Sequence, residues 1–105
     1  MFVKSAERKK RNFKGVDFFV GAVGERMMVT LMTFRTGQKE MAHSHPHEQA
    51  GYCIQGRFIL TIEGESMEIG PDDSYVIPGG AKHDYNILED SISVEMFSPP
   101  REEYR

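Results

Sequence analysis

Three of the four histidines of the chain fall within five residues, at His43, His45 and His47. In a β-strand, residues two positions apart point to the same face, so His43 and His45 would present two imidazoles side by side. A short bend would then bring the carboxamide of Gln49 back on the returning strand. Imidazole nitrogens and amide oxygens are both ligands of divalent metal ions. The stretch therefore predicts half of a metal site.

The fourth histidine, His83, completes this site if the fold returns it to the other ligands. It lies 38 residues after His45 and follows the turn Pro78-Gly79-Gly80. His47 has the same strand parity as His45, but Pro46 interrupts the strand between them, which favours a place beside the site or in solvent. The alternative for all these histidines is a surface strand without a ligand.

These residues resemble the two signature motifs of the cupin superfamily. The first motif, a glycine, a His-x-His pair, an acidic residue and a second glycine, is similar to the stretch from Gly37 to Gly56, with Gln49 at the acidic position. The second motif, a glycine followed by a proline, a glycine, a histidine and an asparagine, is similar to a later set of residues. Its members here are Gly70, Pro78, Gly80, His83 and Asn86.

The resemblance covers residues 17–97 and implies a small single-domain cupin of the cupin 2 type. It implies an all-β fold, the double-stranded β-helix or jelly-roll barrel, with one end open. It also implies one divalent metal ion (Zn, Ni, Fe or Mn) bound inside the barrel. Because Gln49 is neutral where a carboxylate would cancel one charge, the metal would keep its double charge and act as a strong Lewis acid. The implied ligands are His43, His45, Gln49 and His83.

A narrower resemblance joins the histidine stretch to the segment from Phe97 to Tyr104. The pair is similar to small cupins of the KdgF type, which act in pectin and alginate breakdown and convert 4,5-unsaturated monouronates to linear keto-sugars. In that family an Asp shortly before the phenylalanine is the proposed acid/base, and an Arg shortly after it is thought to bind the substrate carboxylate. The resemblance implies these roles for Glu95, which replaces the Asp, and for Arg101.

The residues alone leave both roles open. Glu95 lies on one face of its strand, and the alternate residues of 92–96 make the other face apolar. Its face is therefore either in solvent or inside the barrel, where the carboxyl could move protons. Arg101 offers a planar fork for a carboxylate, or it is an exposed residue of the tail. A metal-dependent dioxygenase and a non-catalytic small-molecule-binding module remain the alternative functions.

The rest of the chain has the pattern of a β-scaffold. Glycines and prolines separate short segments rich in β-branched and aromatic residues, which favours an all-β barrel or sandwich. We expect a basic lead-in over residues 1–16, in which Ser5–Asn12 is helical or irregular, a barrel over 17–97 and a tail over 98–105. The expected strands are Asp17–Val20, Met27–Arg35, Phe58–Ile62, Met67–Ile69, Ser74–Ile77 and Ile92–Phe97.

Length and charge limit the classes of partner. With 105 residues the chain should form one domain with a modest core, so a homodimer is expected. The net charge is −3, with +5 in the first 14 residues and −8 in the remainder. An acidic body argues against nucleic-acid binding, and the run Arg8–Arg11 is better explained as a solvated terminal segment. A small-molecule substrate is the expected partner.

The single cysteine, Cys53, excludes an intrachain disulfide and is expected to be a buried, inert thiol. The N-terminus lacks the apolar stretch of a signal peptide, and no run is long enough to cross a membrane. We therefore expect a cytoplasmic protein that binds neither membrane nor nucleic acid.

Overall fold

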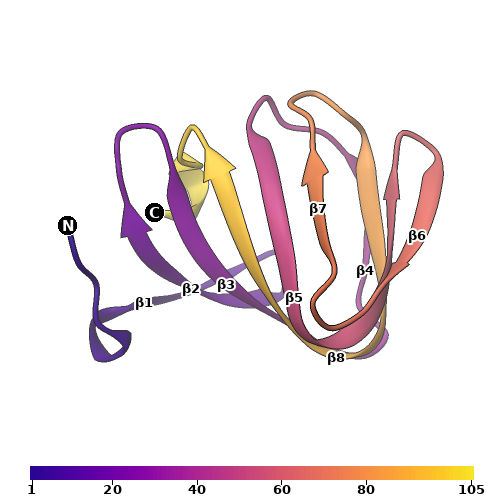
Figure 1. Cartoon of the computed structure of the whole chain (residues 1–105), viewed down its shortest axis with the longest axis horizontal. Coiled ribbons are helices and arrows are strands. Elements are labelled where there is room, and N and C mark those ends of the chain that lie inside the picture. The colour runs from indigo at the N-terminus through magenta and orange to yellow at the C-terminus, as the bar shows by residue number, and fades with distance from the viewer.

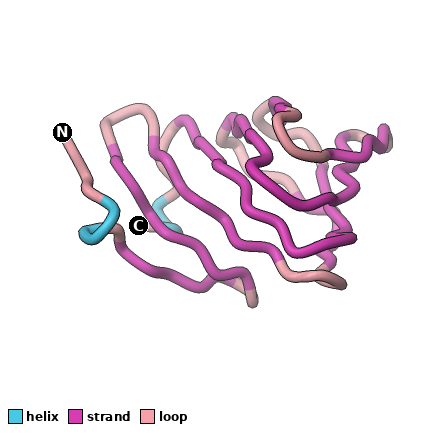
Figure 2. Tube along the Cα trace, turned by 60° about the horizontal axis from the view of Figure 1, so that its bottom comes forward, coloured by secondary structure: helices cyan, strands magenta, loops and turns pink.

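The computed structural model describes residues 1–105 and contains eight β-strands and two three-residue 3-10 turns. Strands dominate the trace in Figure 2, so the prediction of an all-β fold is confirmed. Neither turn approaches the length of a membrane-spanning helix. The elements are η1 (Ser5–Glu7), β1 (Lys9–Phe13), β2 (Val16–Val23), β3 (Met28–Phe34), β4 (Lys39–His43), β5 (Glu48–Ile62), β6 (Glu65–Ile69), β7 (Ser74–Ile77), β8 (His83–Ser98) and η2 (Glu102–Tyr104).

Two long strands, β5 and β8, hold the barrel together because each belongs to both of its layers (Figure 1). In one layer, residues 91–97 of β8 pair with β3, and residues 49–52 of β5 pair with β7. In the other layer, residues 83–86 of β8 pair with β4, and residues 58–62 of β5 pair with β6. All pairs are antiparallel, and β1 and β2 extend the first layer beyond β3. This is the predicted jelly-roll arrangement.

The bend of β5 is made at Gly56, where the register with β8 shifts repeatedly. Gly56 has a φ of +98°, and a Cβ there would overlap the side chain of Ser91 on the facing strand. Only glycine suits both the left-handed backbone and the close approach. The predicted strands Phe58–Ile62 and Ile92–Phe97 are therefore halves of longer, bent strands.

The N-terminal segment differs from the expectation for Ser5–Asn12. Only Ser5–Glu7 is helical, and Lys9–Phe13 forms β1, paired with β2 in a hairpin. The C-terminal turn η2 folds back toward this hairpin, so that the Tyr104 ring lies 5.3 Å from the Phe13 ring, centroid to centroid. The aromatic contact stabilises β1. The basic side chains of this strand give it no alternating apolar pattern, so the sequence did not predict it.

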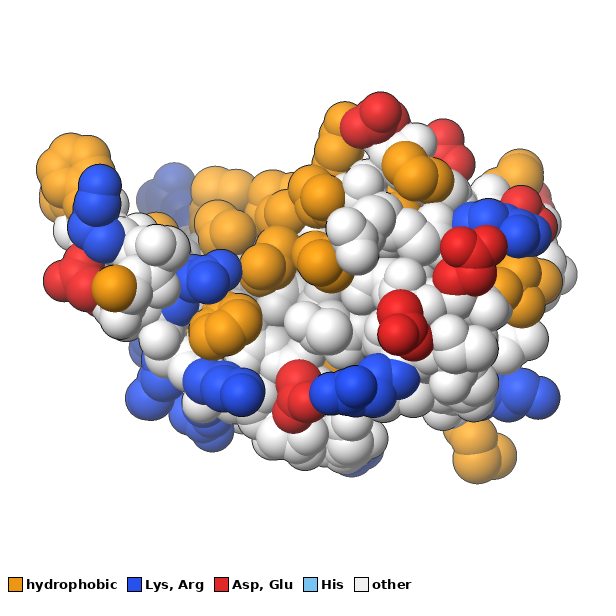
Figure 3. Space-filling view, turned by 90° about the horizontal axis from the view of Figure 1, so that it is seen from below, with side chains coloured by type: hydrophobic (Ala, Val, Ile, Leu, Met, Phe, Trp, Pro, Cys, Tyr) orange, Lys and Arg blue, Asp and Glu red, His pale blue; other side chains and the backbone are white.

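Strand β8 buries the face that looks polar in the sequence. Ser93 and Glu95 are 0% and 1% exposed, and Phe97 between the same layers is 1% exposed. The apolar alternate residues of 92–96 are half-buried on the outside. Of the two places considered for Glu95, solvent is wrong and the barrel interior is correct. The outer face consequently carries hydrophobic side chains, which gather in the view from below in Figure 3.

Candidate metal centre and cavity

Three histidines converge at one end of the barrel. His43 ends β4, His83 begins β8 directly opposite it in the strand register, and His45 follows in the loop to β5. The His83 ring centroid lies 4.2 Å from that of His43 and 4.9 Å from that of His45. One ring nitrogen from each histidine lies within 4.8 Å of the others, a spacing that allows a shared metal ion. Tertiary structure thus brings His83 to the pair predicted from the sequence.

The backbone orients all three rings in the same way. Each Nδ1 faces a carbonyl oxygen two residues away along the chain, which favours the tautomer with the proton on Nδ1 and leaves Nε2 to face the cluster. Neutral imidazole with a free Nε2 is the form that binds metals. The Nδ1–oxygen distances are 3.3 Å from His43 to Met41, 3.0 Å from His45 to His47 and 3.0 Å from His83 to Ala81.

Gln49 presents its amide oxygen to this cluster. Its Nε2 donates a hydrogen bond to Oε1 of Glu95 at 2.7 Å, which leaves Oε1 of Gln49 only 3.1 Å from Nε2 of His45. Burial lowers the pKa of His45, so the ring is neutral and both facing atoms are acceptors. With the ring proton on Nδ1, the two lone pairs face the same space, where a shared cation would stabilise both. The donor set therefore fits a divalent metal ion.

Glu95 is held by hydrogen bonds on both carboxylate oxygens. Gln49 donates to Oε1, while the hydroxyls of Tyr75 and Ser93 donate to Oε2. Burial is the largest influence and raises the pKa of Glu95 to about 7. The Tyr75 ring occupies the space above Gly51, where any Cβ would overlap it. The packing of the ring against Gly51 thus keeps the Tyr75 hydroxyl beside Glu95.

Arg101 is 7% exposed, so its interpretation as an exposed tail residue is wrong. Its Nε donates to Oε1 of Glu103 at 2.9 Å, and its Nη1 donates to the Tyr104 hydroxyl at 2.9 Å. The guanidinium carbon lies 4.1 Å from the centroid of the Tyr104 ring and 5.4 Å from that of Phe97. Its Nη2 makes no hydrogen bond within the protein, which leaves the two N–H donors of that nitrogen for a ligand.

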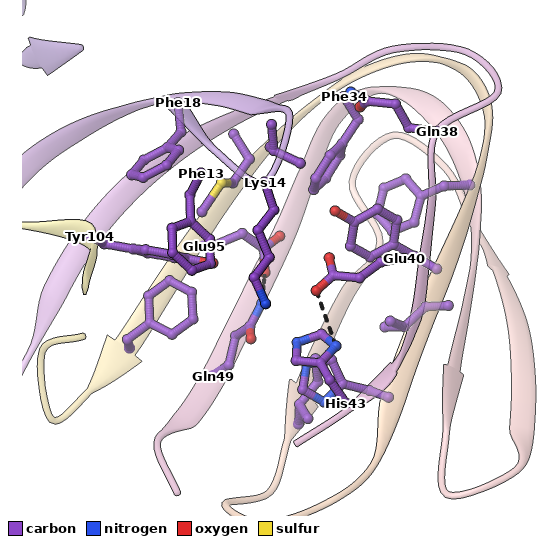
Figure 4. A pocket seen from close by; sticks show the side chains of 18 of the residues that line it. Phe13, Lys14, Phe18, Phe34, Gln38, Glu40, His43, Gln49, Glu95 and Tyr104 are labelled. Carbon is purple, nitrogen blue, oxygen red and sulfur yellow. Dashed lines mark hydrogen bonds and ion pairs between the residues drawn. The ribbon is translucent and has the colours of Figure 1, made fainter. Parts of the chain in front are cut away.

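A cavity of about 300 Å³ joins these groups. Figure 4 shows Glu95 and Gln49 on one side and His43 on the other, with aromatic side chains around them. His83 and Arg101 also line the cavity. This size suits a ligand as small as a monosaccharide.

Three further charged residues line the same cavity and were not singled out by sequence reasoning, Lys14, Lys39 and Glu40. Oε1 of Glu40 lies 3.0 Å from Nδ1 of His43, so the carboxylate adds a second acceptor for that ring proton. No spacing rule marks these residues, because the turn between β1 and β2 and the pairing of β4 with β8 bring them to the cavity. His47 and Cys53 do not line the cavity, and burial raises the pKa of the Cys53 thiol.

Comparison with known families and proteins agrees with this architecture. Residues 30–98 match the family described as Cupin domain. The pectin degradation protein KdgF of Dickeya dadantii is 30% identical over 80 residues, which make up 74% of this chain and 73% of that protein. H2HPP isomerase of Bacillus subtilis is 35% identical over 88 residues, 82% of this chain, which spans only 36% of that protein.

Solved structures give the same result. KdgF from Halomonas sp. superposes with a TM-score of 0.90 over 100% of this chain and 98% of that one, at 30% identity. An RmlC-like cupin from Shewanella frigidimarina has a TM-score of 0.90 over 99% and 95% of the two chains. At 22% identity, that second likeness concerns the fold alone.

Proposed function

Since the chain belongs to the cupin family, we propose that it is a metal-dependent enzyme that converts a small sugar acid, a 4,5-unsaturated monouronate, into a linear keto-sugar. The observation that carries the proposal is the shared cavity: Glu95 and Arg101 line the same space as His43 and His83, two members of the histidine cluster. The 30% identity with the pectin degradation protein KdgF favours a uronate over other acids.

His43, His45, His83 and Gln49 would hold the metal ion, with Zn, Ni, Fe and Mn as candidates. When bound, the ion supplies Lewis-acid polarisation of a substrate oxygen, undiminished by any anionic ligand from the chain. The aromatic and aliphatic side chains that line the cavity would limit the access of water to the ion and the substrate.

Arg101 binds the substrate carboxylate through its free Nη2, while its other donors keep the guanidinium in place. Glu95 is the acid/base. Removal of a proton from the anomeric hydroxyl breaks the bond between C1 and the ring oxygen, which leaves an aldehyde at C1 and an enolate at C5. Return of the proton to C4 turns the enolate into the C5 ketone, so one carboxyl in reach of the hydroxyl and C4 serves both steps. A pKa of about 7 suits a group that must both accept and release a proton near neutrality.

The test is to incubate the metal-loaded protein with 4,5-unsaturated galacturonate and to follow the loss of the enol-ether absorbance. We expect rapid loss for the wild type and a rate reduced at least 100-fold for Glu95→Gln, as expected when acid/base catalysis is removed. Glu65→Gln, at an exposed position of β6, is the matched control and should retain the wild-type rate. A wild-type rate equal to that in buffer would refute the function.

The homodimer expected from the small core is also part of this proposal. The outer face of the first layer offers large apolar side chains, among them Val29, Ile54 and Val76, which are 39%, 47% and 55% exposed. A contiguous apolar face is typical of an association surface. We expect sedimentation of wild type as a dimer and of Val76→Glu as a monomer; a monomeric wild type would contradict the dimer without affecting the chemistry.

A further inference from the structure

The hairpin between β1 and β2 brings a lysine to the cavity. Lys14 is the first residue of the two-residue turn, and it lines the cavity together with the histidines and Glu95. In Figure 4 its side chain extends along the cavity, between the side that carries Gln49 and the side that carries Glu40. From the sequence, this lysine belongs to the basic lead-in expected over residues 1–16, so its position at the cavity is a result of the tertiary structure.

The backbone of Lys14 is unusual for a lysine. Phe13 and Val16 pair across the turn, and its central residues, Lys14 and Gly15, have φ angles of +50° and +87°. A two-residue hairpin turn with both φ angles positive favours Asn-Gly, because asparagine tolerates the left-handed region and lysine does so at a cost. A long cationic side chain at such a position indicates a functional reason for it.

Side chains on both sides anchor this turn. Gly15 N–H donates to Oδ1 of Asn12 at 3.3 Å, and Nδ2 of Asn12 donates to Asp17 at 2.8 Å. Nε2 of Gln38, from the loop before β4, donates to the Gly15 carbonyl at 3.1 Å. The turn is thus tied to the rim of the cavity, which keeps the lysine beside it.

The charge of Lys14 is not neutralised within the protein. It forms no salt bridge, whereas Arg101 is paired with Glu103, and Glu40 contacts His43. Its Nζ lies 5.4 Å from the centroid of the Phe13 ring, a contact that leaves the ammonium donors free. An unpaired ammonium at a cavity that also holds a guanidinium attracts an anion.

We propose that Lys14 is a substrate-binding residue, a second cationic contact with Arg101 for a substrate that carries a carboxylate. This inference rests on the proposed function and adds to it a selectivity for acids over their uncharged esters. Lys14 contacts the Phe13 ring and Arg101 contacts the Tyr104 ring, and the two ring centroids lie 5.3 Å apart. A small sugar acid could therefore contact both charges while its ring packs against the aromatic wall.

The binding test uses galacturonate, a saturated uronate, and its methyl ester as probes in calorimetry on the metal-loaded protein. We expect Lys14→Met to weaken galacturonate binding about tenfold, the lower range for a hydrogen bond between charged groups, and to leave methyl ester binding unchanged. Lys10→Met, on the same hairpin but outside the cavity lining, is the matched control and should bind like the wild type. Equal binding by both variants would overturn the role of Lys14.

Lys39 also lines the cavity, from β4. Its substitution tests whether the loss of any nearby positive charge weakens galacturonate binding. If Lys39→Met weakens galacturonate binding as much as Lys14→Met does, general attraction explains the result and the specific contact is refuted. Lys14→Arg should restore most of the affinity, because it keeps the charge.

Lys14→Asn separates folding from binding. Asparagine suits the left-handed turn, so the melting temperature should be equal or higher, while galacturonate affinity should fall as in Lys14→Met. A lower melting temperature for Lys14→Asn would refute the strained turn. If Lys14→Met keeps wild-type binding while the wild type still converts unsaturated galacturonate, this inference fails and the proposed function stands. If wild type neither binds galacturonate nor converts the unsaturated sugar, both fail together.

Discussion

Oε1 of Glu95 accepts a hydrogen bond from the carboxamide nitrogen of Gln49 at 2.7 Å, and this contact turns the Gln49 oxygen toward the histidines. The carboxylate that we propose as acid/base is therefore also the group that orients a proposed metal ligand. The two roles are separable by experiment, because orientation affects metal affinity even when no substrate is present.

Glu95→Ala should lower metal affinity about tenfold, the lower range for loss of an outer-shell partner of a metal ligand. Without the carboxylate, the Gln49 amide loses the acceptor that holds its oxygen toward the cluster. Competition with a chromophoric chelator measures the affinity, with Glu65→Ala as control. An unchanged affinity would show that Gln49 is not a ligand or needs no orientation.

A second carboxylate, Glu40, contacts the cluster from the other side, 3.0 Å from Nδ1 of His43. Glu40→Gln should also lower metal affinity about tenfold, because a neutral amide stabilises the orientation and basicity of the imidazole less well than a carboxylate. The same chelator competition applies, with Glu48→Gln, an exposed position at the start of β5, as control. Metal uptake equal to that of the control would exclude a role for Glu40.

The stability of the metal-free protein should depend on pH through Glu95. Burial raises its pKa from 4.5 to about 7, so between these values the folded protein keeps a proton that the unfolded chain has released. Protonated Glu95 therefore makes its full contribution to the free energy of unfolding below pH 4.5. This contribution, up to about 3 kcal/mol, is lost as the pH rises through 7.

Urea unfolding in the presence of a chelator measures this effect as the difference between wild type and Glu95→Gln, which cannot titrate. Relative to the variant, the wild type should lose stability as the pH rises over this range. Burial lowers the pKa values of His45 and His83, but both proteins share these histidines, so their contribution cancels. A difference independent of pH would contradict the raised pKa.

Gly51 is predicted to tolerate no side chain, because a Cβ there would overlap the ring of Tyr75. Gly51→Ala should destabilise the protein by about 1–3 kcal/mol, the usual cost of overpacking a core. It should also release one hydrogen bond to Glu95. The control is Gly24→Ala, because a Cβ at Gly24 would make only an ordinary contact with the Met27 carbonyl oxygen. This variant should lose less than about 1 kcal/mol of stability. Equal melting temperatures for the two variants would contradict the prediction.

Much of the site could be predicted from local spacing. His43 and His45 are only two residues apart, at the end of β4 and in the loop after it, and the glycine and proline turns that frame them are local features that short-range rules describe. The convergence of His83 followed from the family pattern. The face of β8 that carries Glu95 could not be assigned to the interior from the sequence. Alternation shows that a strand has two faces, but it does not show which of them the second layer covers.

The sequence by itself determined the all-β class, the family and the metal-type donors, because residue type, strand alternation and turn chemistry are properties of neighbouring residues. Only the tertiary structure decided which residues share the cavity. The bend of β5 at Gly56 and the folding of the β1–β2 hairpin and the C-terminal turn toward each other place Glu95, Arg101 and Lys14 around it. These contacts join segments far apart in the chain, and their geometry depends on packing between layers, which no local pattern records.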